Sequence, residues 1–212
     1  QLVDDMPFTL DSNIDPNGGD QQRVYIQQAL LADIQQGDTL LLDDGRLTLQ
    51  VTAKSSTAAT CIVIQGGVLS SKKGVNKFGG GLFADALTHK DMADIKTAAA
   101  LKTDYLAISF VRSREDVELA RRLLNAAGSN AHIIAKIERA EAITETYLPG
   151  IIASADGVMV ARGDLGVEIG DANLVAVQKH LIEAATNANK VVITATDSEY
   201  ADISRVTIIP PF

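Results

Sequence analysis

The chain has 212 residues, of which 46% are hydrophobic, a size that suits one mid-sized domain or two small ones. Its formal net charge of −8 at pH 7 argues against nucleic acid as the main partner, because phosphate backbones attract Lys and Arg. No apolar run reaches the roughly 18 residues of a membrane span, so we expect no membrane partner.

The single cysteine, Cys61, lies in an apolar stretch and has no second cysteine to pair with. We interpret it as a buried structural thiol rather than a nucleophile. No Cys/His cluster has the spacing of a zinc site, and the sequence therefore predicts a reducing, cytoplasmic location. The three histidines, His89, His132 and His180, are scattered along the chain, and none is expected to be catalytic.

The first third of the chain has the pattern of β-structure. Residues 39–51 combine an apolar run, an Asp-Asp-Gly turn signal and an alternating segment, which predicts a hairpin. Residues 58–69 predict a further strand that ends in a Gly-rich turn. Turn signals at 15–19 and 36–38 complete the pattern of a small antiparallel barrel or sandwich.

Near residues 71–81 the sequence becomes basic and Gly-rich, which indicates a hinge or a loop. After it, helical and strand patterns alternate. The pair Thr88 and Asp91 has the spacing of a capping box, and so has the pair Ser113 and Asp116. Each pair predicts the start of a helix.

Four strands are predicted in this second part, and two further helices are expected near 139–148 and 172–189. The predicted strands span 104–110, 132–138, 157–161 and 190–196. Strands that alternate with helices imply a parallel sheet, either open and doubly wound or part of a (β/α)8 barrel. The absence of a glycine-rich phosphate-binding motif after any strand disfavours the nucleotide-binding open sheets.

Polar residues occur where these strands end, which is where parallel α/β folds bind their ligands. Lys136 and Glu138 share one face of their strand, because side chains alternate along a strand. They form either a buried ion pair or a metal-binding carboxylate beside a cation that stabilises developing negative charge.

Arg162, Gly163 and Asp164 follow the next strand and precede a predicted helical turn. The backbone N–H groups of such a turn can form an anion nest, and Asp164 can supply an oxygen ligand that suits Mg²⁺ or Mn²⁺. The simpler interpretation of Asp164 is a helix N-cap. Thr196, at the end of the last strand, could likewise be an N-cap.

Taken together, these segments resemble pyruvate kinase. Residues 133–143 are similar to the family's strand with its Lys and metal-binding Glu, and residues 154–170 are similar to its most characteristic segment. Residues 37–49 and 66–82 resemble its B domain and return hinge, and residues 103–117 the barrel strand that follows. The resemblance implies a partial (β/α)8 TIM-type barrel with an inserted small β-barrel domain.

The resemblance divides the chain into three parts. Residues 1–76 correspond to the B (lid) β-barrel domain, residues 77–196 to a partial TIM-barrel A domain, and residues 197–212 to nothing in the family. The family's first three barrel strands, with its potassium ligands and a phosphate-gripping Arg, have no counterpart here. We therefore expect an internal piece of the enzyme. The tail is a foreign segment, a frame change or a different partner strand.

The activity implied is the glycolytic transfer of a phosphoryl group between phosphoenolpyruvate and ADP, which yields pyruvate and ATP, in a homo-oligomer that is a tetramer in the family. The cofactors implied are Mg²⁺ (or Mn²⁺) and K⁺. Glu138 and Asp164 would bind the Mg²⁺, and Lys136 would neutralise the phosphoryl group during transfer. Thr196 would take part in enolate protonation. Ser109 would lie near the phosphate and the monovalent cation.

The resemblance also implies how the substrates are held. The backbone of the segment after the third predicted strand would bind the pyruvate carboxylate. That segment comprises Ala161, Arg162, Gly163 and Asp164. Lys73, Asp43 and Asp44 would lie on the lid that closes over the nucleotide. Because an incomplete barrel leaves strand edges unpaired, we expect this chain alone not to turn over phosphoenolpyruvate.

Two alternatives stay open. One is an Mg²⁺-dependent aldolase or lyase that forms a pyruvate enolate on a TIM barrel; the inserted β domain and the Lys-Lys-Gly-Val-Asn segment of the hinge argue against it. The other is a non-catalytic fragment, which the missing strands favour.

Overall fold

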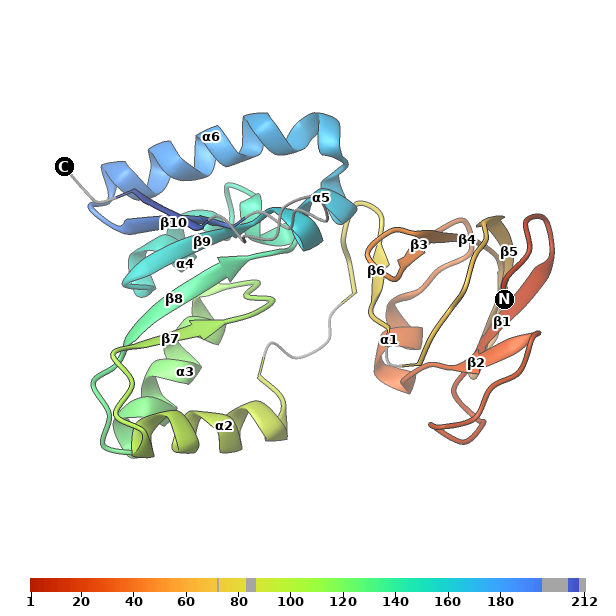
Figure 1. Ribbon diagram of the computed structural model, residues 1–212, viewed down its shortest axis with the longest axis horizontal. Coiled ribbons are helices and arrows are strands. Elements are labelled where there is room, and N and C mark those ends of the chain that lie inside the picture. The colour runs from red at the N-terminus through yellow and green to blue at the C-terminus, as the bar shows by residue number, and fades with distance from the viewer. Residues whose placement is uncertain (72, 83–86, 196–205, 210–212) are drawn as a thin grey trace. The chain divides into compact units, whose positions relative to one another are not determined.

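The protein is described by a computed structural model that covers residues 1–71, 73–82, 87–195 and 206–209. The chain divides into two compact units, Gln1–Ala84 and Asp85–Phe212, and each has its own hydrophobic core (Figure 1). Within the described residues, no helix has the length and apolar character needed to cross a membrane.

A six-stranded sheet forms the first unit. Its elements are β1 (Pro7–Asp11), β2 (Arg23–Tyr25), α1 (Gln28–Asp33), β3 (Thr39–Leu42), β4 (Leu47–Lys54), β5 (Ala58–Gln65) and β6 (Val75–Lys77). The strand order is β2-β1-β5-β4-β3-β6, and every pair except β1–β2 is antiparallel. The small β domain expected from the sequence is therefore present.

The predicted hairpin of β3 and β4 is confirmed, with Leu42 opposite Leu47. Its turn places Asp43, Asp44 and Gly45 at φ values of 52°, 56° and 82°. Residues other than Gly, Asn and Asp are disfavoured at these positive φ values, which explains why two Asp residues and a Gly occupy the turn. On β4 the alternating side chains of Leu47, Leu49 and Val51 point into the core, as their period of two predicts.

Two elements of the first unit differ from the expectation of β-structure and loops. The helix α1 forms in the segment before β3 because Leu31 and Ile34 are fully buried, and burial outweighs a start without a side-chain cap. The strand β6 forms inside the Gly-rich segment 71–81 by pairing with β3. An ion pair of 2.9 Å between Lys77 Nζ and Asp38 Oδ2 accompanies this pairing.

The second unit is built on a five-stranded sheet with the order β11-β10-β9-β8-β7. Its elements are α2 (His89–Ala100), β7 (Tyr105–Ile108), α3 (Arg114–Ala126), β8 (His132–Ile137), the 3-10 helix η1 (Glu141–Ile143), α4 (Leu148–Ser154), β9 (Gly157–Ala161), α5 (Arg162–Ile169), α6 (Asp171–Asn187), β10 (Val191–Ala195) and β11 (Val206–Ile209). The strands β7 to β10 are parallel, as predicted, and Figure 1 shows them side by side in chain order.

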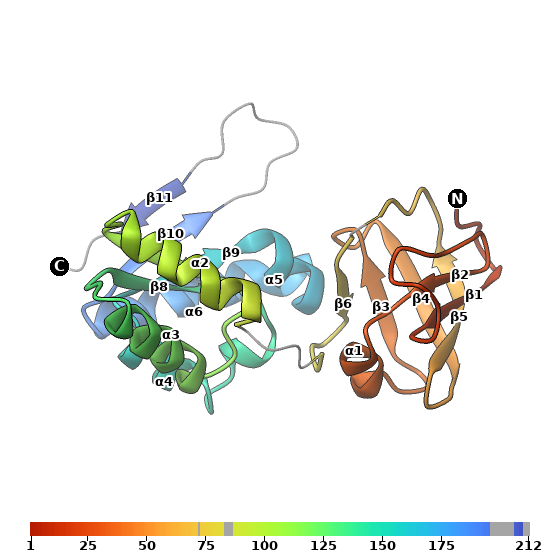
Figure 2. The ribbon, with the colours of Figure 1, turned by 90° about the horizontal axis from the view of Figure 1, so that it is seen from below.

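One face of this sheet carries the core beneath the helices, and Figure 2 shows α2, α3 and α4 packed next to one another there. The core face of the strands consists of Ile108, Ile133, Ala135, Ile137, Val158, Val160 and Val192. Because side chains alternate, Tyr105, Lys136 and Met159 lie on the opposite face, where they are exposed or half-buried. This opposite face leads to the strand ends that carry the candidate site.

The predicted capping boxes are both present at the starts of α2 and α3. At α2, the backbone N–H of Thr88 donates to Asp91 Oδ2 at 2.8 Å, and the backbone N–H of Asp91 donates to Thr88 Oγ1 at 3.3 Å. This reciprocal pairing satisfies two backbone donors that the helix itself cannot.

The prediction of a single helix near 139–148 is wrong. The chain instead forms the short η1 and then α4, which starts at Leu148 and has Pro149 in its first turn. Proline is tolerated there but breaks a helix interior, so a helix cannot continue across it from residue 139. The buried side chains of Leu148 and Ile151 hold α4 at its observed position.

The tail contains a strand that the sequence did not reveal. Residues Val206–Ile209 form β11, which pairs antiparallel with β10. The tail therefore supplies a partner strand to β10. Among the described strands, β7 at the other end of the sheet has a partner on one side only.

Candidate active site

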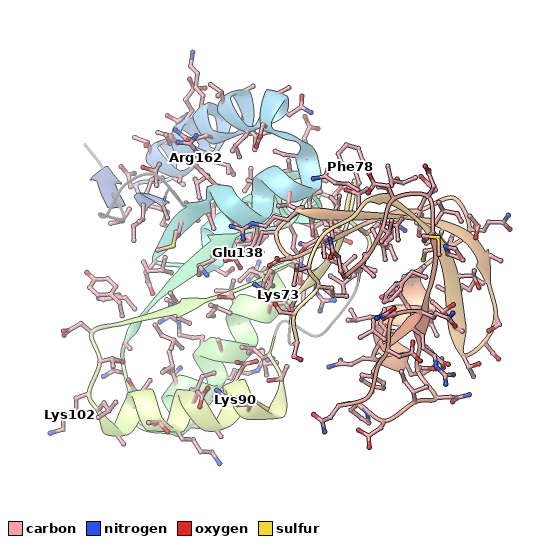
Figure 3. The ribbon with its side chains drawn as sticks, turned by 45° about the vertical axis from the view of Figure 1, so that its right-hand side comes forward. Lys73, Phe78, Lys90, Lys102, Glu138 and Arg162 are labelled. Atoms are coloured by element: carbon pink, nitrogen blue, oxygen red, sulfur yellow. The ribbon has the colours of Figure 1, made fainter. Side chains whose placement is uncertain are left out.

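Two charged side chains meet at the carboxyl end of β8. Lys136 Nζ lies 2.5 Å from Glu138 Oε1, and the side chain of Glu138 is only 1% exposed. Figure 3 labels Glu138 just beyond the end of this strand. The prediction that these two residues share one face is confirmed by their contact. The Glu138 carboxylate needs this pairing, because an isolated buried carboxylate is very costly.

The end of the neighbouring strand β7 completes this cluster. Lys136 Nζ donates a hydrogen bond of 2.9 Å to Ser109 Oγ. The backbone N–H of Phe110 donates one of 2.6 Å to Glu138 Oε2. Phe110 has a φ of 55°, a conformation that non-glycine residues rarely adopt, and it presents its N–H group to the carboxylate from that conformation. The structure therefore brings Ser109, Lys136 and Glu138 together.

The segment Ala161–Asp164 forms the start of α5 (Figure 3 labels Arg162). Ala161 is the N-cap, and Arg162, Gly163 and Asp164 are the first three helical residues. The N-cap interpretation of Asp164 is therefore wrong, because helix formation begins earlier than the sequence suggested. The N–H groups at the start of a helix and the positive end of its dipole favour an anion.

The turn after β8 adds contacts that the sequence did not suggest. Arg139 Cζ lies 5.2 Å from the centre of the Phe110 ring, within the range of a cation–π interaction. The backbone N–H of Ala140 donates a 2.8 Å hydrogen bond to Glu168 Oε2. Glu168 is buried, and its only sequence signal is a charge at a core position of α5.

In the first unit, the structure places two of the predicted lid residues in contact. Lys73 Nζ lies 2.5 Å from Asp43 Oδ1, and Asp43 is buried. Asp44, the next residue of the turn, is exposed. The basic segment and the hairpin turn are therefore joined by an ion pair.

Other candidates lie elsewhere. Thr196 falls outside the described residues. His132 and His180 are both exposed, and His132 Nδ1 lies 3.6 Å from Asp156 Oδ2 at the opposite end of β8 from Glu138. Cys61 is a buried free thiol whose pKa burial raises to about 12. The prediction of a structural rather than a nucleophilic cysteine is confirmed.

The donor set fits a hard cation of the Mg²⁺ type. Within the described part of the chain, no three His, Cys, Asp or Glu side chains gather as a complete metal cage. Mg²⁺ needs none, since it commonly takes one or two carboxylates and completes its shell with water and substrate oxygens. Glu138 and Asp164 follow the adjacent parallel strands β8 and β9, and their side chains carry carboxylate oxygens of this kind.

Comparison with known sequences identifies the family. Residues 1–201 match the sequence profile of the family described as "Pyruvate kinase, barrel domain". The chain belongs to the pyruvate kinase family. The match confirms the pyruvate kinase resemblance seen in the motifs. The family is one of phosphotransferases. The match ends within the tail, before β11.

Individual relatives support the same family assignment. The chain is 52% identical to "Pyruvate kinase" of Buchnera aphidicola subsp. Acyrthosiphon pisum and 53% identical to "Pyruvate kinase II" of Salmonella typhimurium, each over 89% of this chain and 40% of the relative. A solved pyruvate kinase from Cryptosporidium parvum superposes with a TM-score of 0.85 at 29% identity, over 92% of this chain and 41% of that one.

These matches settle the fold class. The curled parallel sheet is a part of the pyruvate kinase barrel rather than an open doubly wound sheet, and the aldolase or lyase alternative is not favoured. The chain spans about 40% of the length of the curated pyruvate kinases that it matches.

Proposed function

We propose that this chain carries the metal- and enolate-binding half of a pyruvate kinase active site, in an enzyme that transfers a phosphoryl group between phosphoenolpyruvate and ADP. The observation that supports this most is the cluster of the buried Glu138 with the half-buried Lys136 and Ser109 at the ends of β7 and β8. A half-buried cation beside a buried carboxylate suits phosphoryl transfer, which depends on positioning and charge neutralisation.

Each residue of the site has a role in this proposal. Glu138 and Asp164 hold Mg²⁺, which supplies the charge that stabilises the enolate oxygen. Lys136 neutralises the phosphoryl group in transfer, and Ser109 orients Lys136 beside the phosphate and monovalent-cation region. Thr196 takes part in enolate protonation.

The carboxylate of pyruvate binds at the start of α5. The backbone of Ala161, Arg162, Gly163 and Asp164 forms the first turn of this helix, and the N–H groups and positive dipole end of a helix start favour an anion. A planar carboxylate is small enough to take two such donors. The lid residues Lys73, Asp43 and Asp44 contact the nucleotide and exclude water that would otherwise accept the phosphoryl group.

We further propose that the enzyme acts in glycolysis in the cytoplasm as a homo-oligomer that uses K⁺ as well as Mg²⁺. The potassium ligands are expected in a part of the family's chain that has no counterpart here. This chain alone is therefore expected to be inactive. A coupled assay of pyruvate formation with Mg²⁺, K⁺ and ADP tests that expectation, and turnover at the rate of an intact pyruvate kinase would contradict it.

Metal binding tests the site itself. Mn²⁺ replaces Mg²⁺ and is counted by electron paramagnetic resonance, with oxalate added as an enolate mimic. We expect Glu138→Gln and Asp164→Asn each to weaken Mn²⁺ binding by more than about 10-fold, because each removes a charged ligand. Glu183→Gln, an exposed change on α6, is the matched control. Equal Mn²⁺ affinity in all four proteins would exclude this metal site.

A further inference from the structure

A buried carboxylate of α5 has no part in the chemistry described above. Glu168 is 2% exposed, and it accepts a 2.8 Å hydrogen bond from the backbone N–H of Ala140. A carboxylate that is removed from water is costly, so its retention at a core position requires a compensating contact. The hydrogen bond from Ala140 connects Glu168 to the turn that follows β8.

This contact joins the two segments that carry the candidate metal ligands. Ala140 lies two residues after Glu138 in the chain. Glu168 lies four residues after Asp164, one helical turn along the same α-helix. The Glu168–Ala140 hydrogen bond therefore fixes the exit of β8 against α5, and with it the spacing between the two ligands.

The same turn is held from the other side. Phe110, at the end of β7, donates its backbone N–H to Glu138 Oε2, and its ring packs against Arg139. Residues 138–140 are thus held in place by β7 through the contacts of Phe110 and by α5 through the hydrogen bond to Glu168. A loss of the α5 contact releases one of these two restraints, and the Glu138 carboxylate gains freedom to rotate away from its observed position.

We propose that Glu168 is a positioning residue, which sets the orientation of the Glu138 carboxylate relative to the start of α5 through the backbone of Ala140. The proposal deepens the proposed function and rests on it for the identity of the ligands. Residues that orient ligands in this indirect way commonly change metal affinity by about 10- to 100-fold when they are replaced.

The test compares three variants with the wild-type chain. Glu168→Ala removes the acceptor, Glu168→Gln keeps an oxygen acceptor for the Ala140 N–H group, and Glu183→Ala is an exposed control on α6. The first readout is hydrogen exchange of the Phe110 amide by NMR, which reports the bond to Glu138 and needs no metal. The second readout is Mn²⁺ affinity by electron paramagnetic resonance.

We expect Glu168→Ala to speed exchange of the Phe110 amide by about 10-fold or more and to weaken Mn²⁺ binding by a similar factor. Glu168→Gln is expected to restore both, and the amide of Leu124 in α3 is expected to exchange as in the wild type. If the alanine variant does not fold, Glu168→Asp, whose side chain is one methylene shorter, withdraws the acceptor instead.

Four outcomes would overturn the proposal. The first is unchanged Phe110 exchange in Glu168→Ala, and the second is an equal loss of protection at Leu124, which would indicate a purely structural role. The third is a Glu168→Gln variant that is as defective as Glu168→Ala. The fourth is unchanged Mn²⁺ affinity in Glu168→Ala while Glu138→Gln abolishes binding. If the wild-type chain binds no Mn²⁺, the proposed metal site fails, and the exchange of the Phe110 amide still decides the role of Glu168.

Discussion

Lys136 and Glu138 form an ion pair of 2.5 Å in which the lysine side chain is 26% exposed and the glutamate side chain 1%. The two residues are next-but-one neighbours at the end of a single strand, so no long loop has to be ordered to bring them together. The cost of burying the glutamate is offset by the lysine and by the Phe110 N–H group. The lysine and the N–H group thus compensate a charge that would otherwise be costly to bury, at the strand end that carries the candidate site.

Replacing the lysine should reveal the stabilising role. We expect Lys136→Met to lower the free energy of unfolding by about 3 kcal/mol, because it leaves a buried carboxylate without its cation. Urea unfolding followed by far-UV circular dichroism measures the change. Lys179→Met, at an exposed position of α6, should change the stability by less than about 0.5 kcal/mol. An equal midpoint for the two variants would show that the ion pair adds no stability.

A second carboxylate should give a pH-dependent contribution. Burial raises the pKa of Asp156, but hydrogen bonds from Arg121 and from the backbone N–H of Ile133 outweigh it and lower the pKa below its ordinary 3.8. A lowered pKa means that the stabilisation is complete above about pH 4 and is lost as the pH falls through the folded-state value.

We expect Asp156→Asn to destabilise the protein by about 1–2 kcal/mol at pH 7, a value reduced for partial exposure of the carboxylate. The difference between variant and wild type should shrink toward zero below pH 4. Urea unfolding at pH 7, 5 and 3 measures it. A difference that stays constant over this range would contradict the assigned role of the ionised carboxylate.

The cap of α2 should contribute more than the ion pair beside it. Thr88→Ala removes the side chain that accepts from the Asp91 N–H group, and we expect a loss of about 1 kcal/mol. Asp94→Ala removes an exposed partner of Lys90 and should cost no more than about 0.5 kcal/mol. Thermal unfolding compares the two variants, and a larger effect of Asp94→Ala would reverse this ranking.

Cys61 provides a chemical probe of the first unit. Because the thiol is fully buried and its pKa is raised to about 12, we expect no reaction with a thiol reagent at pH 8 in native buffer and rapid, stoichiometric labelling in denaturing urea. Labelling in native buffer at the rate of free cysteine would mean that this core opens readily. Since the chain has one cysteine, the signal reports this position alone.

Local patterns predicted most of the second unit correctly. The capping boxes at Thr88 and Ser113 depend only on residues three positions apart, and both are present. The four parallel strands were recognisable from short apolar runs separated by helical spacing. The pairing of Lys136 with Glu138 follows from the alternation of side chains along one strand.

The sequence by itself determined the family, the alternation of strands and helices along the second unit and the residues that stand at the strand ends, because these depend on local spacing and on motifs contained within short segments. Only the tertiary structure decided which distant groups meet. Glu168 contacts Ala140 across 28 positions of the chain, and Phe110 reaches Glu138 across the same separation. Contacts of this kind depend on how strands and helices pack, and no local periodicity encodes them. The strand β11 likewise exists through its pairing with β10, which supplies its backbone hydrogen bonds.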